Sequence, residues 1–314
     1  MNSFDTWILR GIYSKQNKSR LSQISDLIDW MPIHQILDEM YDNKSDKGGR
    51  PNYDVILMFK ILILQHWYSL SDLEVERQIV DRISFMAYLG FPDPFPDFRT
   101  IWLFKQRMAE TDKDKLVWGE LQRQLDLKGL KVKHGTIQDA TFIESDPGYS
   151  KKPRGSEAKT RRSRDGTWAK KGNEIHFGYK LHQKTDIDYC LIREIESTTA
   201  SVHDSQVDLS VEGEPIFRDR GYFGVRPKGI DFTMKRRTSD KTLSDLDKER
   251  NRLISKLRSP GERPHAVIKR VLKRVFRAGR VLVTTVRRVN VEMIITAFAF
   301  NLYQLYTLKK AQVI

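Results

Sequence analysis

The chain has 314 residues, of which 39% are hydrophobic and 10% aromatic, so it can bury one large core or two modest ones and is not a disordered protein. Its single cysteine, Cys190, excludes a disulfide framework and a thiolate zinc site. Its apolar runs are too short to span a membrane and its N-terminus lacks an apolar signal core, so we expect a cytoplasmic protein. A formal net charge of +14 favours a polyanionic partner, for which nucleic acid is the first candidate.

Residues 1–130 are predicted to form an all-helical N-terminal domain. The apolar run Val55–Trp67 is long enough for a buried helix, and Ser71, followed three residues later by a glutamate, has the pattern that caps the next helix. After a proline-rich connection, either Asp97 or Thr100 can cap a further helix. Short helices joined by tight turns are compatible with a DNA-binding domain of helix-turn-helix type and equally with a plain helical packing domain.

Residues 131–314 change to a pattern of strands and helices, which predicts one α/β domain. Strand-forming composition is found at Lys131–Ile143, Ile175–Lys184, Tyr189–Glu196, Pro215–Arg218 and Gly229–Lys235. Helices are expected at about 242–258, from Glu262 onward and at about 290–309. A polar, basic stretch over residues 149–173 predicts a mobile loop.

Two segments of this second domain hold the excess positive charge. Residues 151–180 carry ten lysines and arginines against three acids, and residues 256–288 carry eleven against one, Glu262. Charge concentrated in this way suits contacts with the phosphate backbone of DNA, although a basic surface can also serve solubility alone. Trp168, in the first segment, is able to stack on an unpaired DNA end. His182 can approach phosphates or a metal, but a structural role is commoner for a histidine.

Three acids stand at positions that suit a metal site. Asp139 lies within a predicted strand, Asp219 directly follows a short one, and Glu262 lies at a helix start. Carboxylates from strands and a helix can together hold two Mg²⁺ or Mn²⁺ ions, roughly 3.5–4 Å apart, for in-line phosphoryl transfer. Spacing alone leaves open that they are ordinary surface acids. Arg258 and Lys269 are expected on the same helical face as Glu262, as phosphate contacts or as an ion-pair cluster.

The spacing of Arg258, Glu262 and Lys269 resembles the signature of DDE transposases encoded by prokaryotic insertion sequences. That signature has a tyrosine where this chain has Ser255, so the role of Ser255 stays open. Four further segments resemble the aspartate motifs and the blocks between them: 138–141, 176–182, 199–205 and 219–223. Four N-terminal segments resemble the helical domain of the IS-five-like group: 53–60, 67–72, 76–78 and 96–101.

The resemblance implies an RNase H-like catalytic core, a mixed sheet with flanking helices, preceded by an all-helical domain that binds the terminal repeats. It implies that Asp139, Asp219 and Glu262 are the catalytic residues and the ligands of two Mg²⁺ or Mn²⁺ ions. We expect DNA contacts from the basic residues of the charged segments: Arg258, Lys269, Lys170, Lys171, Arg263, Arg270 and Lys180.

The implied reaction has two steps on double-stranded DNA. Hydrolysis at the terminal inverted repeats exposes a 3′-OH, and that 3′-OH then attacks target DNA. A homodimer is implied, because two element ends must be handled together, and the protein is expected to associate with the nucleoid. Two alternatives remain: a metal-dependent DNA nuclease without strand transfer, and a catalytically inactive, transposase-derived DNA-binding protein.

Overall fold

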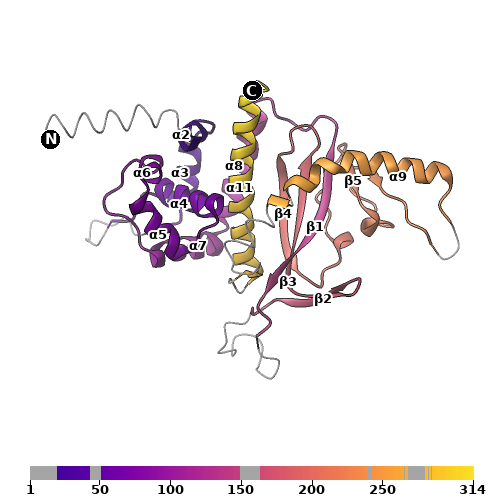
Figure 1. Ribbon diagram of the computed structural model, residues 1–314, viewed down its shortest axis with the longest axis horizontal. Helices are drawn as coiled ribbons and strands as arrows, with labels where there is room; N and C mark the ends of the chain where they lie inside the picture. The colour runs from indigo at the N-terminus through magenta and orange to yellow at the C-terminus, as the bar shows by residue number, and fades with distance from the viewer. Residues whose placement is uncertain are drawn as a thin grey trace. The chain divides into compact units, whose positions relative to one another are not determined.

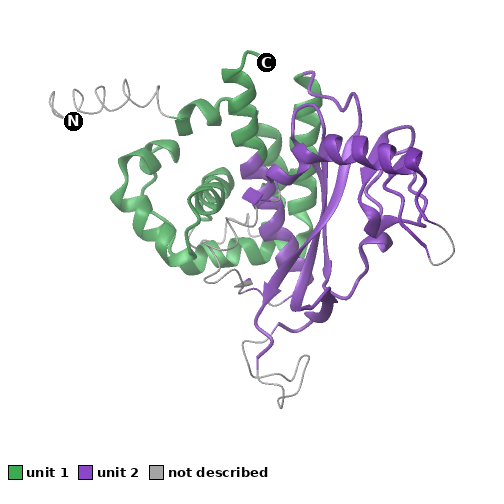
Figure 2. Ribbon diagram, turned by 45° about the vertical axis from the view of Figure 1, so that its right-hand side comes forward, with its two compact units in different colours: residues 1–128, 301–314 green, residues 129–300 purple. Residues whose placement is uncertain are grey.

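The computed structural model describes residues 20–42, 51–148, 163–238, 242–264, 266–267, 280–281, 283 and 285–314. The chain divides into two compact units, one of residues 1–128 and 301–314 and the other of residues 129–300 (Figure 2). Helix α11 (Val286–Lys310) contributes residues to both units. Within the described ranges, no helix is both long enough and apolar enough to cross a bilayer.

The first unit is helical. Its helices are α2 (Arg20–Ser25), α3 (Met31–Asp38), α4 (Val55–Tyr68), α5 (Asp72–Asp81), α6 (Ile83–Tyr88), α7 (Phe98–Thr111) and α8 (Lys113–Leu127). The predicted apolar helix is confirmed as α4, which is buried on most sides because its sequence is apolar all round.

Side-chain caps begin three of these helices. The Ser71 hydroxyl accepts a hydrogen bond from the Glu74 amide at 3.2 Å, as its sequence pattern predicts. Asp97 Oδ1 accepts from the Thr100 amide at 2.7 Å, so Asp97 rather than Thr100 caps α7. Asp54 caps α4 in the same way.

The second unit is built on a mixed sheet (Figure 1). Its strands are β1 (Thr136–Ser145), β2 (Thr167–Lys171), β3 (Glu174–Asp186), β4 (Ile192–Thr199), β5 (Pro215–Arg218), β6 (Ile230–Thr233) and β7 (Arg280–Val281). The order is β2-β3-β1-β5-β6, with β4 also on β3 and β7 also on β1. β3 pairs antiparallel with β1, β2 and β4, whereas β5 pairs parallel with β1 and β6.

Helix α9 (Asp245–Arg258) and the first part of α11 accompany the sheet. Single 3₁₀ turns occur at η1 (Asp204–Gln206), η2 (Arg220–Tyr222) and η3 (Ser259–Gly261). A helical region followed by a mixed sheet with flanking helices confirms the expected fold class, an RNase H-like core.

Part of the expected loop over 149–173 is instead a strand. Thr167–Lys171 forms β2, because its β-branched and aromatic residues pair with β3 and Gly172 adopts the positive φ of a tight turn. Residues 149–162 of the expected loop lie outside the described residues. The strand expected over Tyr189–Glu196 begins at Ile192, later than expected, because Cys190 has φ +53° and interrupts the extended chain.

Candidate active site

Two of the three predicted carboxylates lie at the same level of neighbouring parallel strands, Asp139 within β1 and Asp219 directly after β5. In the β1–β5 register Gln138 lies opposite Arg218, and Asp139 and Asp219 are the next residues of the chain. Because side chains alternate along extended backbone, and Asp219 is itself extended at φ −78° and ψ −178°, both acids are directed to one face of the sheet.

That face is covered by α9. Ile254 of α9 packs into a buried cluster with Ile137 and Phe217, which precede the two acids by two residues each. One helical turn further along α9, Arg258 reaches the strand, and its Nη2 lies 3.4 Å from Asp139 Oδ2. The packing of α9 therefore delivers a guanidinium to the first carboxylate.

The second carboxylate is held by the turn that it begins. Asp219 Oδ1 accepts a hydrogen bond from the Gly221 amide at 2.8 Å. A Cβ atom on Gly221 would lie 3.0 Å from this oxygen, so the close turn favours glycine. Tyr222 is buried in the same turn; burial, together with the charges of Asp204, Asp139 and Asp219, raises the pKa of its hydroxyl.

The third acid, Glu262, is exposed and follows a turn that packs against β1. Gly261 is buried, and a Cβ atom there would lie 2.9 Å from Ile137 Cγ2. The backbone before Glu262 is thus next to the strand segment that carries Asp139. Even so, no three His, Cys, Asp or Glu side chains in the described part of the chain lie close enough together to hold a metal ion.

The donor chemistry of the site fits a hard divalent cation. Asp139 and Asp219 supply only oxygen ligands, and side-chain exposure of 34% leaves Asp139 accessible. Like charges repel, so carboxylates gather where positive charge compensates them, and Arg258 supplies such a charge to Asp139 here. The β1–β5 register sets two of the three predicted ligands at the same level of the sheet, and Glu262 follows the turn that packs against β1.

The basic residues predicted to contact DNA differ in their accessibility. Lys170 and Lys171 are exposed on β2, and Arg263 is exposed at the start of the helix after η3. Lys269 and Arg270 lie outside the described residues. The three exposed cations are available to phosphates.

Lys180 and His182 of β3 are buried. The Lys180 ammonium lies 2.7 Å from Asp204 Oδ1 and donates to the Val202 carbonyl at 2.6 Å, so its charge is used within the fold. His182 Nε2 lies 2.9 Å from Thr198 Oγ1. Burial, with a smaller contribution from Lys180, lowers the pKa of His182 to about 4, so its ring is neutral at neutral pH.

A basic cavity of about 400 Å³ lies between α9 and the turn after Asp219. Its lining residues are Arg220, Met234, Leu243, Lys248, Asn251, Arg252, Ser255 and Lys256. Lys248, Arg252 and Lys256 recur every four residues and so follow one face of the helix. That spacing is visible in the sequence, although none of these three residues is among the predicted DNA contacts. Ser255 lines the same cavity.

Two families have models that match this chain. Residues 131–302, more than half of the chain, match the model described as Transposase DDE domain. Residues 11–107 match the model described as Transposase domain (DUF772). No solved structure matches the chain.

Proposed function

The chain belongs to the DDE transposase family, whose members cleave and join DNA, and from this premise we propose the reaction that it carries out. It cleaves DNA at the terminal inverted repeats of an insertion sequence and joins the exposed 3′-OH ends to target DNA. Within the family, we assign it to the IS-five-like group, on the N-terminal segments between Tyr53 and Ile101. Its Arg258, Glu262 and Lys269 signature is like that of the IS-four-like group.

The observation that carries the proposal is the β1–β5 register, in which Asp139 and Asp219 directly follow the paired residues Gln138 and Arg218. We assign these two acids and Glu262 as catalytic residues and as ligands of two Mg²⁺ or Mn²⁺ ions. Bound there, the metals would activate the attacking oxygen and stabilise the leaving oxygen. Arg258 contacts Asp139, and we propose that its guanidinium exchanges this carboxylate for a DNA phosphate when DNA binds.

DNA is expected to lie across the cavity beside α9, the exposed β2 and the segment after Glu262. Lys170, Lys171, Arg263 and the cations of α9 would bind phosphates, and we keep Lys269 and Arg270 as predicted contacts. Lys180 is assigned instead to holding Asp204. The helical unit would bind the terminal repeats, and a nucleoid-associated homodimer would pair two ends.

Asp139→Asn tests the assignment directly. We expect it to abolish Mn²⁺-dependent nicking of a duplex carrying the DNA that flanks the gene, while affinity for that duplex is retained. Asp245→Asn is the matched control, because Asp245 is exposed at the start of α9 and bonds only to Lys248 in the described contacts. Full nicking by Asp139→Asn would refute the catalytic assignment.

A joining assay separates transposition from simple hydrolysis. A pre-cleaved end with a free 3′-OH is incubated with a supercoiled target plasmid, and joined products are expected from the wild type. Cleavage without joining would indicate a nuclease, and DNA binding without any Mn²⁺-dependent nicking would indicate a catalytically inactive protein.

A further inference from the structure

We propose that Gln138 and Arg218 are positioning residues, which hold Asp139 and Asp219 at one level from the opposite face of the sheet. The inference rests on the proposed function, because it concerns the same two acids. Each polar residue directly precedes one acid, and the two lie opposite each other in the β1–β5 register. Both are 0% exposed, which is unusual for a glutamine and an arginine.

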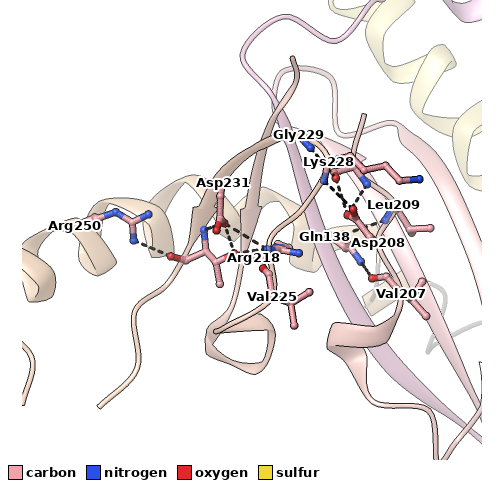
Figure 3. A network of polar contacts seen from close by, with 12 residues as sticks. Gln138, Val207, Asp208, Leu209, Arg218, Val225, Lys228, Gly229, Asp231 and Arg250 are labelled. Atoms are coloured by element: carbon pink, nitrogen blue, oxygen red, sulfur yellow. Dashed lines mark hydrogen bonds and ion pairs between the residues drawn. The ribbon is translucent and has the colours of Figure 1, made fainter. Parts of the chain in front are cut away.

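Arg218 closes the loop that carries Asp219. Its Nε donates to Thr233 Oγ1 on β6 at 2.8 Å, and its Nη2 donates to the Val225 carbonyl at 2.7 Å (Figure 3). Asp219 lies between Arg218 and Val225 in the chain, so the second bond spans the loop that the acid begins. The guanidinium also lies 5.4 Å from the ring centre of Tyr222 in this loop. Arg218 thereby restrains the loop at its far end and in its middle.

Gln138 uses both atoms of its side-chain amide. Its Nε2 donates to the Val207 carbonyl at 2.7 Å, and its Oε1 accepts from the Leu209 amide at 3.3 Å. The side chain therefore bonds to the backbone of residues 207–209 through both groups of its amide (Figure 3). The amide cannot rotate without losing both bonds, so it restrains β1 at the residue before Asp139.

The segments bound by Gln138 and Arg218 are themselves joined. Asp208 Oδ2 accepts from the Lys228 amide at 2.9 Å, and Ser210 Oγ accepts from the Gly229 amide at 3.0 Å. Residues 228–229 lead directly into β6, whose Thr233 accepts the Arg218 bond. One continuous layer of polar contacts thus lies beneath the two acids.

The hydrogen bonds of this layer fix the orientation of its side chains, which hydrophobic packing does not do. Asp231 Oδ1 accepts from Thr233 Oγ1 at 2.5 Å and lies 3.5 Å from Arg218 Nη2, so the Thr233 hydroxyl is itself oriented. Arg250 of α9 donates to the Thr233 carbonyl at 2.8 Å and so links this layer to the helix on the other face. Groups that orient metal ligands typically change metal affinity by about 10–100-fold when they are removed.

The test compares two variants of this layer with one matched control. Arg218→Met keeps the length of the side chain and removes its donors. Thr233→Val is milder, because it removes only the hydroxyl that accepts from Arg218 and donates to Asp231, at nearly constant shape. Arg193→Met is the control, because Arg193 is a buried arginine of the same unit whose Nε lies 3.0 Å from Asp186 Oδ2. Mn²⁺ binding without DNA is followed by the electron paramagnetic resonance of the free ion, alongside duplex affinity, unfolding by urea and nicking against Mn²⁺ concentration.

We expect Arg218→Met to weaken Mn²⁺ binding by about 10–100-fold and Thr233→Val by a smaller factor, with duplex affinity unchanged in both. Arg193→Met should lose stability and bind Mn²⁺ like the wild type. Unchanged Mn²⁺ binding in both layer variants, or an equal loss in Arg193→Met, would overturn the positioning role. Asp219→Asn separates this result from the proposed function: if it binds Mn²⁺ as the wild type does, the metal-ligand assignment itself fails.

Discussion

Gly261→Ala adds one methyl group at the turn that leads to Glu262. The new Cβ atom would lie 2.9 Å from Ile137 Cγ2 and 3.1 Å from its Cδ1, well inside the roughly 3.5–4 Å at which carbon atoms attract. Gly261 has no positive φ, so backbone strain does not contribute. Ile137 is 3% exposed and packs against Phe217 and Ile254, so it has little room to move. The turn itself must therefore shift.

The expected cost has a structural and a catalytic part. Overpacking a core typically costs about 1–3 kcal/mol. The lower entropy of the unfolded alanine chain offsets about 0.4–1 kcal/mol of this. We therefore expect a net loss of about 1–2 kcal/mol in the free energy of unfolding. A shift of the turn approaching 1 Å misplaces Glu262, and a displacement of that size is able to lower a catalytic rate by about 100-fold.

Urea unfolding and Mn²⁺-dependent nicking measure the two parts separately. Gly119→Ala in α8 is the control, since nothing lies within 4 Å of a Cβ atom there. Its free energy of unfolding should rise by up to about 1 kcal/mol, and it should nick DNA as the wild type does. Ile137→Ala removes both clashing atoms, so the Gly261→Ala/Ile137→Ala double variant should lose less stability than the two single losses added together. Additive losses, or wild-type nicking by Gly261→Ala, would refute this reasoning.

Three further predictions concern pH, salt and unpaired DNA. The folded pKa of His182 is about 4, below its ordinary 6.5, so its stabilising contribution is complete above pH 6.5 and is lost as pH falls towards 4. Over this range the free energy of unfolding of the wild type should fall by about 3 kcal/mol more than that of His182→Gln, measured by urea unfolding at several pH values. Removing two cations of the α9 cavity, with Arg252→Ala and Lys256→Ala together, should reduce the slope of log Kd against log salt for duplex DNA by about 2. Trp168 is 49% exposed, and Trp168→Ala should weaken binding to a DNA end with unpaired bases by about 1–3 kcal/mol, measured by fluorescence anisotropy, with little effect on a blunt duplex.

Each of these predictions has a control and a contrary outcome. An equal pH dependence of the free energy of unfolding in the wild type and His182→Gln would contradict the prediction for pH. Lys228→Ala removes an exposed cation remote in sequence from α9 and should leave the salt slope nearly unchanged. The prediction for salt is contradicted if Lys228→Ala changes the slope as much as the double α9 variant does. Trp102→Ala replaces another tryptophan of 43% exposure, and the third is contradicted if both tryptophan variants weaken binding to unpaired ends equally.

Elements with local signals agree closely between sequence and structure. The apolar run at α4 and the Ser71 cap each depend on residues within a few positions of one another. β5 has the predicted bounds, Pro215–Arg218. The expected loop that became β2 shows the limit of such signals, because its strand-forming residues make a strand only by pairing with β3.

For the candidate site, the sequence by itself determined which residues to consider: three acids in a recognisable order, and two basic segments that carry the excess charge. The tertiary structure alone decided their relations. The β1–β5 register sets Asp139 beside Asp219, α9 brings Arg258 to Asp139, and burial turns Lys180 inward to Asp204. Caps and periodicity act over a few residues, whereas register and burial depend on contacts between segments far apart in the chain, which a residue's immediate neighbours do not encode.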